Sequence, residues 1–220
     1  MNPQNYIFIS VLMYAVLVPV IAAIAGTWQL PFFWTALALQ LLIGVIGGKK
    51  LDPELIAERL KPKGKDQDPY AQLILGICFV LQFGLAALDV GRWHVADNIP
   101  MPLQIVALIP YALGWIGMMW SMQANKFFSS AIRLQPDRGQ AVVSSGPYKY
   151  IRHPGYSFAS LGFFFEGIAL GSWLSVLAAL PIVIDLAYRT VLEERLLTKD
   201  LPGYKEYTQS VRFRWLPGVW

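Results

Sequence analysis

Hydrophobic residues gather into long runs along the chain, and most polar residues lie between these runs. Four runs are long enough to cross about 30 Å of membrane hydrocarbon as helices. They cover Tyr6–Ala25, Phe32–Gly48, Tyr70–Leu88 and Pro102–Met122. Two shorter apolar arms, Ser157–Gly171 and Trp173–Tyr188, form a hairpin that turns at Gly171-Ser172. The pattern predicts an all-α, polytopic transmembrane helix bundle of about six spans, although arms this short also suit a hairpin that enters and leaves the membrane on one side.

Three segments outside the runs are polar and basic: residues 49–69, residues 123–156 and the tail from 189 to 220. In the first of them, Asp52 suits the N-cap of a helix and Pro53 suits its first position. We therefore predict a short surface helix that continues to Leu60, with a solvated basic loop as the alternative.

The composition is that of a membrane protein. Hydrophobic residues make up 55% of the 220 positions, and charged residues only 15%. An average soluble domain has about 25% charged residues. Eight Trp and ten Tyr residues suit a protein that meets two water–lipid interfaces. In the second run, Gly44 and Gly48 have the spacing that allows two helices to approach closely.

The basic residues predict the topology. Seventeen of the 18 Lys and Arg residues lie in the three polar segments, and the exception is Arg92. Six crossings would place these segments on one side of the membrane, which the positive-inside rule assigns to the cytosol. We expect both termini on the cytosolic side of a bacterial inner membrane, with the first run retained as a span rather than removed as a signal peptide. The net charge of +4 then reflects topology, and no nucleic-acid partner is expected.

Several classes of site lack their sequence signatures. No G-x-G-x-x-G follows a strand pattern and no P-loop occurs, so we expect no Rossmann domain. The lone Cys78 cannot form an intramolecular disulfide. His94 and His153 would lie on opposite sides of the membrane, which argues against a histidine-rich metal centre. An active site is therefore expected among the cytosolic loops and helix ends.

Residues 144–156 form the first candidate site. Two X-Pro steps bias the preceding residues away from helix and would make the segment a rigid connection. It would hold one cation, one imidazole and two phenols in fixed relation, in Arg152, His153, Tyr148 and Tyr156. These groups suit a small polar ligand, and a basic loop that only anchors lipid headgroups fits them equally well.

A second cluster lies at the end of the last apolar arm. Asp185, Arg189 and Glu193 are spaced four apart and would share one face of a helix, with Glu194 beside them. In the functional interpretation, Arg189 binds an anionic group and Glu193 accepts hydrogen bonds from hydroxyl or ammonium groups. The alternative is a simple ion-pair ladder. Glu166, within the first arm, would either face the bundle or line a substrate path.

The C-terminal third resembles the isoprenylcysteine carboxyl methyltransferase and phospholipid methyltransferase superfamily. The resemblance covers roughly residues 135–212 and rests on a composite of motifs. These are Gly146-Pro147-Tyr148-x-x-x-Arg152-His153-Pro154-x-Tyr156, an apolar hairpin, Arg189-x-x-x-Glu193-Glu194-x-x-Leu197 and Gly203-Tyr204-x-x-Tyr207. The segment Asp52–Arg59 is also similar to one in bacterial members.

The resemblance implies a multi-span methyltransferase that binds S-adenosylmethionine on the cytosolic side without a Rossmann domain. It assigns cofactor contacts to the main chain of Gln140, Ala141, Val142 and Val143, and to Tyr148, His153, Pro154, Gly155, Tyr156, Glu193 and Glu194. It assigns Arg189 to the acceptor side, with Arg189 and Glu193 as the catalytic pair. The chain departs from the family in its acidic run of only two residues, and in Arg133, which replaces a cofactor-contacting glutamine of eukaryotic relatives.

The resemblance also divides the chain and defines the chemistry. Residues 1–122 would form a four-span bundle that shapes a lipid-facing pocket, and residues 123–220 the cofactor-binding and catalytic region. A carboxylate acceptor is already ionised at pH 7 and needs no general base, whereas an amine or thiol would need Glu193, Glu194 or His153.

Two other functions fit the same sequence. One is an NADPH-dependent membrane reductase similar to the sterol reductases, which share a related C-terminal architecture. The other is a non-enzymatic membrane transporter or scaffold. In the preferred interpretation, the partner is a lipophilic small molecule, a lipid-modified acceptor or a membrane lipid.

Overall fold

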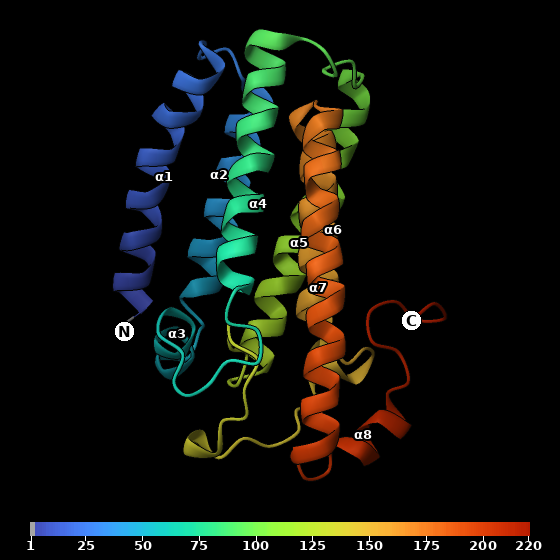
Figure 1. Cartoon of the computed structure of the whole chain (residues 1–220). Coiled ribbons are helices and arrows are strands. Elements are labelled where there is room, and N and C mark those ends of the chain that lie inside the picture. The colour runs from blue at the N-terminus through green and yellow to red at the C-terminus, as the bar shows by residue number, and fades with distance from the viewer. Residues whose placement is uncertain (1–2) are drawn as a thin grey trace.

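The computed structural model describes residues 3–220, and every regular element in that range is helical. Six long helices form the bundle: α1 (Pro3–Ala25), α2 (Pro31–Gly48), α4 (Ala71–Leu88), α5 (Met101–Ala124), α6 (Pro154–Leu170) and α7 (Trp173–Asp200). Two short helices, α3 (Pro53–Leu60) and α8 (Tyr204–Ser210), lie at one end of the bundle (Figure 1). The short turns η1 (Asp89–Trp93), η2 (Pro136–Arg138) and η3 (Gly146–Lys149) lie in the connections. The predicted all-α bundle is confirmed.

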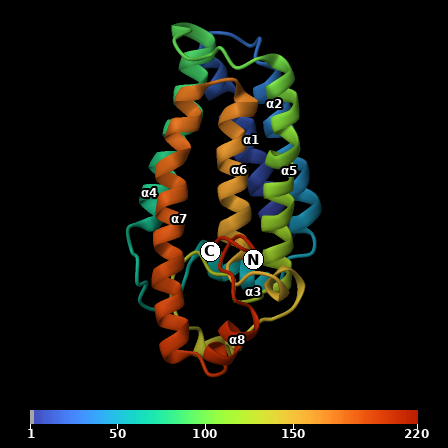
Figure 2. The same ribbon diagram turned by 90° about the vertical axis from the view of Figure 1, so that its right-hand side faces the viewer.

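Five helices in the described range have the length and apolar composition needed to cross a membrane: α1, α2, α4 together with η1, α5 and α7. The sixth, α6, has only 17 residues. It lies between α5 and α7 along the bundle (Figure 2), so its polar and small residues are buried by protein rather than exposed to lipid. Glu166 is one of them and is fully buried in the interior.

The last long helix, α7, extends further than the apolar pattern predicts. α7 has 28 residues and continues twelve residues beyond Tyr188, to Asp200. The polar stretch after Tyr188 is rich in Leu, Glu, Arg and Lys, which favour helix as strongly as most apolar residues do. The helix therefore extends past the apolar region and brings Glu193 and Glu194 to the loops at its end.

Close packing between α5 and α6 depends on two facing glycines. A Cβ atom added at Gly114 would lie 2.5 Å from the main-chain nitrogen of Gly162, closer than real Cβ contacts allow. The helix contact expected at Gly44 and Gly48 is different: a Cβ at Gly44 would meet open space, and one at Gly48 would meet the Tyr6 ring. The close main-chain approach between α5 and α6 is therefore at Gly114 and Gly162.

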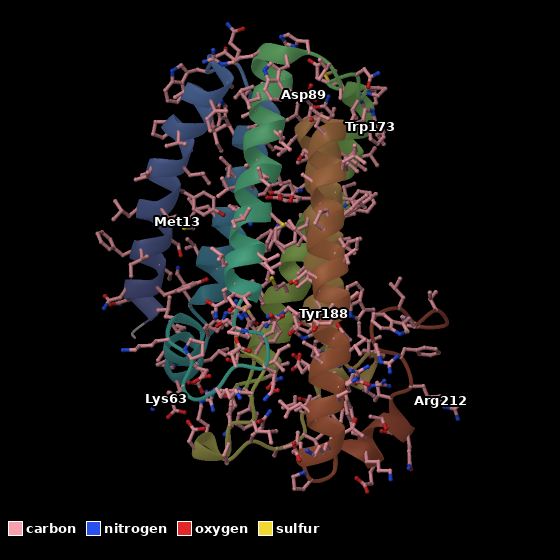
Figure 3. The ribbon with its side chains drawn as sticks, viewed as in Figure 1. Met13, Lys63, Asp89, Trp173, Tyr188 and Arg212 are labelled. Atoms are coloured by element: carbon pink, nitrogen blue, oxygen red, sulfur yellow. The ribbon has the colours of Figure 1, made fainter. Side chains whose placement is uncertain are left out.

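The two ends of the bundle differ in charge, and Figure 3 places Lys63 and Arg212 at one end and Asp89 and Trp173 at the other. All three basic segments meet at the first end, as the six-crossing topology predicts. At the opposite end, Arg92 donates to the carbonyls of Ile24 (2.6 Å) and Ala23 (3.0 Å), so it caps the end of α1. There the buried Asp89 carboxylate accepts from the N–H groups of Val95 and Ala96.

The surface helix α3 forms as predicted. The Asp52 carboxylate accepts from the N–H of Glu54 at 2.7 Å, Pro53 occupies the first position, and the helix ends at Leu60. Its Glu58 forms a two-pronged ion pair with Arg133, with both N–O distances 2.8 Å. Because Arg133 lies in the loop after α5, this pair fastens that loop to the N-terminal half of the chain.

Candidate active site

A pocket opens at the basic end of the bundle, next to the start of α6 and the C-terminal part of α7. It contains about 770 Å³ not filled by protein atoms, a volume that includes the open solvent at its mouth. One wall is the loop that follows α5, another is formed by α7 and α8, and the turn before α6 supplies the floor. Segments far apart in the sequence therefore combine in one concave site.

The wall formed by α7 and α8 is held by the Glu194 carboxylate. Arg152 donates to both of its oxygens at 2.8 Å, and Arg214 approaches Oε2 at 3.2 Å. The Tyr204 hydroxyl donates to Oε1 at 2.7 Å, and His153 Nε2 lies 2.9 Å from the same atom. Burial and the nearby Glu194 charge raise the pKa of Tyr204, so the phenol stays protonated and remains a donor.

The C-terminal tail completes this network. The Arg152 guanidinium donates to the carbonyls of Val211 and Arg212, both at 2.7 Å, while the N–H groups of Arg152 and His153 donate to Phe213 and Arg214. The Tyr207 hydroxyl donates to the Tyr148 carbonyl at 2.6 Å. The tail therefore fixes the two turns that carry Tyr148 and His153.

Glu193 faces the pocket from the same turn of α7. Its carboxylate is about one-third exposed, and its nearest ion-pair contact is His153 Nδ1 at 3.7 Å. The His153 ring stacks on Tyr156, with ring centroids 5.9 Å apart and planes 11° from parallel. The pocket thus presents an accessible carboxylate next to a rigid imidazole–phenol pair.

The opposite wall presents main chain rather than charge. Ala141, Val142 and Val143 line the pocket as an irregular strip that follows Gln140. Within residues 3–220, their N–H and C=O groups have no hydrogen-bond partner. Unpaired main-chain groups along a pocket are available to a ligand with donors and acceptors of its own.

A model of the phospholipid methyltransferase family matches residues 103–202. The matched segment begins in the first turn of α5 and ends after α7, so it includes the His153 turn and both acids. Residues 103–202, a little less than half of the chain, are therefore similar to the phospholipid methyltransferase family. Because this family is part of the isoprenylcysteine carboxyl methyltransferase superfamily, the resemblance found in the sequence is confirmed.

One curated relative is similar to this chain over 134 residues. The cobalt-zinc-cadmium resistance protein CzcN of Cupriavidus metallidurans is 30% identical over 134 residues. The alignment covers 59% of this chain and 57% of that protein, so the chain spans little more than half of its relative. Among residues 3–220, no group of three or more His, Cys, Asp or Glu side chains is placed to hold a metal ion.

Most of the residues predicted to contact the cofactor lie at the pocket. The residues that line it are Gln140, Ala141, Val142, Val143, Tyr148, His153, Gly155, Tyr156 and Glu193. Pro154 does not line it and instead occupies the first turn of α6. Glu194 does not line it either, because its carboxylate is turned toward Arg152 and enclosed by the network described above.

Arg189 lies apart from the pocket wall. Its side chain is 3% exposed, and its guanidinium donates to the Ser130 carbonyl at 2.8 Å and to Asp68 at 3.3 Å. In place of the ladder along α7 that was the alternative interpretation, Arg189 forms bonds to loops from elsewhere in the chain. Arg189 still lies next to the side chain of Tyr156, which does line the pocket.

Sequence reasoning missed the aromatic share of the lining. Phe127 and Phe128 come from the loop after α5, and Tyr204 and Tyr207 come from α8. The pair in α8 carried a signal, because Gly203-Tyr204-x-x-Tyr207 is part of the family motif. Arg133 also lines the pocket, but its guanidinium is engaged by Glu58 and Asp137 and so is not free for a ligand.

Proposed function

We propose that this protein is an integral membrane methyltransferase that transfers a methyl group from S-adenosylmethionine to a lipophilic acceptor. A carboxylate, as in isoprenylcysteine carboxyl methylation, is the favoured acceptor group. The observation that carries the proposal is the pocket lined mostly by the family segment, which combines an accessible carboxylate, aromatic rings and unpaired main-chain groups next to membrane-spanning helices.

The residues present fit the cofactor. Glu193 is free to accept hydrogen bonds from ribose hydroxyls or from the ammonium group, because its only ion-pair contact is long. The rings of Tyr148 and Tyr156 offer faces that attract a cation or stack on a base. The main chain of residues 141–143 offers the donors and acceptors that an adenine edge requires.

When bound, S-adenosylmethionine supplies a methyl group on a positively charged sulfur. Alignment and electrostatics account for most of the catalysis in such a displacement, so the protein needs to position groups rather than to form covalent bonds. We assign the positioning to His153 and Tyr156, which Glu194 and Arg189 hold from behind.

The type of acceptor decides whether a base is needed. A carboxylate is ionised at pH 7 and can react without losing a proton. An amine or a thiol must lose one, and the contact between Glu193 and His153 would supply the base. We favour the carboxylate because its methylation requires no proton transfer and therefore no base.

The proposal includes an orientation and a division of labour. With the basic end in the cytosol, the pocket faces the compartment in which a soluble cofactor is available. Residues 123–220 would bind the cofactor, and the helices of residues 1–122 would receive the acceptor from the membrane. A bacterial inner membrane suits this arrangement.

Calorimetric titration of the detergent-purified protein with S-adenosylhomocysteine tests the proposal. We expect binding by the wild type, and binding at least ten-fold weaker after Glu193→Gln, which keeps the shape but removes the charge. Glu206→Gln, on the exposed face of α8, is the matched control and should bind as the wild type does. Binding of NADPH in place of S-adenosylhomocysteine would support the reductase instead, and binding of neither would contradict both enzymes.

A further inference from the structure

A second cavity lies beside the first, within the N-terminal half of the bundle. It is lined by α1, α2 and α5, with α3 at its basic end, and contains about 700 Å³ not filled by protein atoms, the open space at its mouth included. Its lining is mostly apolar and rich in methionine, with Met13, Met118, Met119 and Met122 among the wall residues. Methionine side chains adapt to irregular apolar ligands, so the cavity suits a flexible hydrocarbon body.

One charged group lines this cavity. Arg59, in the last turn of α3, has no hydrogen bond or ion pair from its guanidinium to any other residue in the range 3–220. Its nearest defined partner is the ring of Phe128, whose centroid lies 5.2 Å from the guanidinium carbon. By contrast, Arg133, Arg152 and Arg189 are all paired with carboxylates.

An unpaired guanidinium in such surroundings is costly. Burial lowers the pKa of Arg59, and the nearby Arg189 charge lowers it further, against the opposing effect of neighbouring tyrosines. Arginine nevertheless stays charged in proteins. A desolvated charge without a partner is unfavourable, and an anionic ligand would remove that cost.

Arg59 also lies at the boundary between the two cavities. Phe128, on which it packs, lines the proposed cofactor pocket, as do Tyr148 and Tyr156, both of which interact electrostatically with the guanidinium. An anionic group bound at Arg59 would therefore lie next to the place from which the methyl group is delivered, while an attached chain would fill the methionine-lined cavity.

We propose that this cavity is the acceptor site, and that Arg59 receives the anionic head of an amphipathic acceptor whose hydrocarbon body lies between α1, α2 and α5. The inference rests on the proposed function, since it names the substrate class of the same enzyme. The head is a carboxylate or a phosphate, which share the same chemistry toward a guanidinium.

Bromine quenching of tryptophan fluorescence tests this site directly, because Trp115 is part of the cavity wall. The probes are 9,10-dibromostearate and the matching dibromostearyl alcohol, which differ only in the charge of the head. In nonionic detergent we expect the acid to quench Trp115 at concentrations at least ten-fold lower than the alcohol. Loss of the signal in Trp115→Phe would assign it to the cavity.

Two variants separate the head from the body. Arg59→Gln should abolish the advantage of the acid over the alcohol, and Arg195→Gln, an exposed arginine on α7, should preserve it. Gly44→Leu should block both probes, because Gly44 lines the cavity and a Cβ there meets only open space. Gly76→Leu is the matched control, since Gly76 on α4 also faces open space but does not line the cavity.

Equal quenching by acid and alcohol in the wild type, or an unchanged preference in Arg59→Gln, would overturn the inference. A dibrominated phosphatidic acid repeats the titration, and saturation by it rather than by the fatty acid would assign the anion to a phosphate. S-Adenosylhomocysteine binding is measured on the same samples. We expect Arg59→Gln and Gly44→Leu to retain it, which also shows that they are folded, whereas its absence from the wild type would contradict the proposed function without affecting the quenching result.

Discussion

Arg152 and Glu194 form a two-pronged ion pair, in which Nε and Nη2 of the arginine each lie 2.8 Å from one carboxylate oxygen. The residues are 42 positions apart, and both side chains are less than 10% exposed. The pair joins the turn before α6 to α7, and the arginine also holds the tail through the carbonyls of Val211 and Arg212. The proposed cofactor pocket therefore has a charged support directly behind its wall.

The first prediction concerns Glu194→Gln. Loss of one member of a buried ion pair leaves the other charge uncompensated, at a cost of about 3–5 kcal/mol. We expect a clearly lower melting midpoint in detergent, together with weaker S-adenosylhomocysteine binding. Glu193→Gln should weaken binding without lowering the midpoint, because its carboxylate is partly exposed and has no short ion pair. Equal midpoints for the two variants would show that Glu194 is not a structural support.

The different roles of these adjacent acids illustrate a limit of sequence interpretation. Neighbouring residues of an α-helix point about 100° apart, so Glu193 and Glu194 approach His153 from different sides and have different surroundings. The direction in which each one points depends on how α7 is rotated against its neighbours, and the spacing of residues within α7 does not contain that information. The composite motif could identify both acids but could not separate the one that lines the pocket from the one that supports it.

Local signals were more reliable than distant ones. Asp52 and Pro53 predicted the start of α3 because capping acts within one turn. The Glu58–Arg133 pair joins residues 75 positions apart, and no spacing rule relates them. The engagement of Arg189 by Asp68 and the lack of a partner for Arg59 depend on the same long-range contacts between loops. The charge pattern predicted that these residues lie at one end of the bundle, but not their partners.

The second prediction is a pH dependence that depends on Glu58. Burial alone would raise the pKa of Glu58, but the hydrogen bonds and charge of Arg133 outweigh it and hold the pKa below its ordinary value of 4.5. The folded state therefore binds this proton less readily than the unfolded state does. The resulting stabilisation is complete above the ordinary pKa and is lost as the pH falls through it toward the folded value.

We expect the melting midpoint of the wild type to exceed that of Glu58→Gln at pH 7, and the difference to shrink as the pH is lowered toward 4. Glu206→Gln, which removes an exposed carboxylate, should follow the wild type throughout this range. A difference between wild type and Glu58→Gln that stays constant with pH would mean that the Arg133 pair does not hold Glu58 ionised.

The third prediction concerns the contact between α5 and α6. Because a Cβ at Gly114 would lie within 3 Å of the Gly162 main chain, Gly114→Ala must push the helices apart. Overpacking of this kind costs about 1–3 kcal/mol. The melting midpoint should fall, whereas that of Gly84→Ala should stay the same or rise, since a Cβ at Gly84 meets open space. An unchanged midpoint in Gly114→Ala would show that the two helices can separate without cost.

The fourth prediction tests the tail as a support for the pocket. The Tyr207 hydroxyl donates to the Tyr148 carbonyl at 2.6 Å, and Tyr148 lines the pocket beside the main chain of residues 141–143. Tyr207→Phe removes this hydrogen bond, worth about 1 kcal/mol, while it preserves the ring that packs on Tyr204. We expect the Kd for S-adenosylhomocysteine to rise several-fold by calorimetry, with little change in melting midpoint.

Tyr150→Phe is the control for that experiment. Tyr150 directly follows η3, the turn that contains Tyr148, but it is exposed and does not line the pocket. Its affinity should equal that of the wild type. If Tyr207→Phe also binds with unchanged affinity, the position of Tyr148 does not depend on the tail, and the pocket is organised by the Arg152–Glu194 pair alone. A loss in Tyr207→Phe would instead show that the tail of the chain acts on the cofactor through a single main-chain carbonyl.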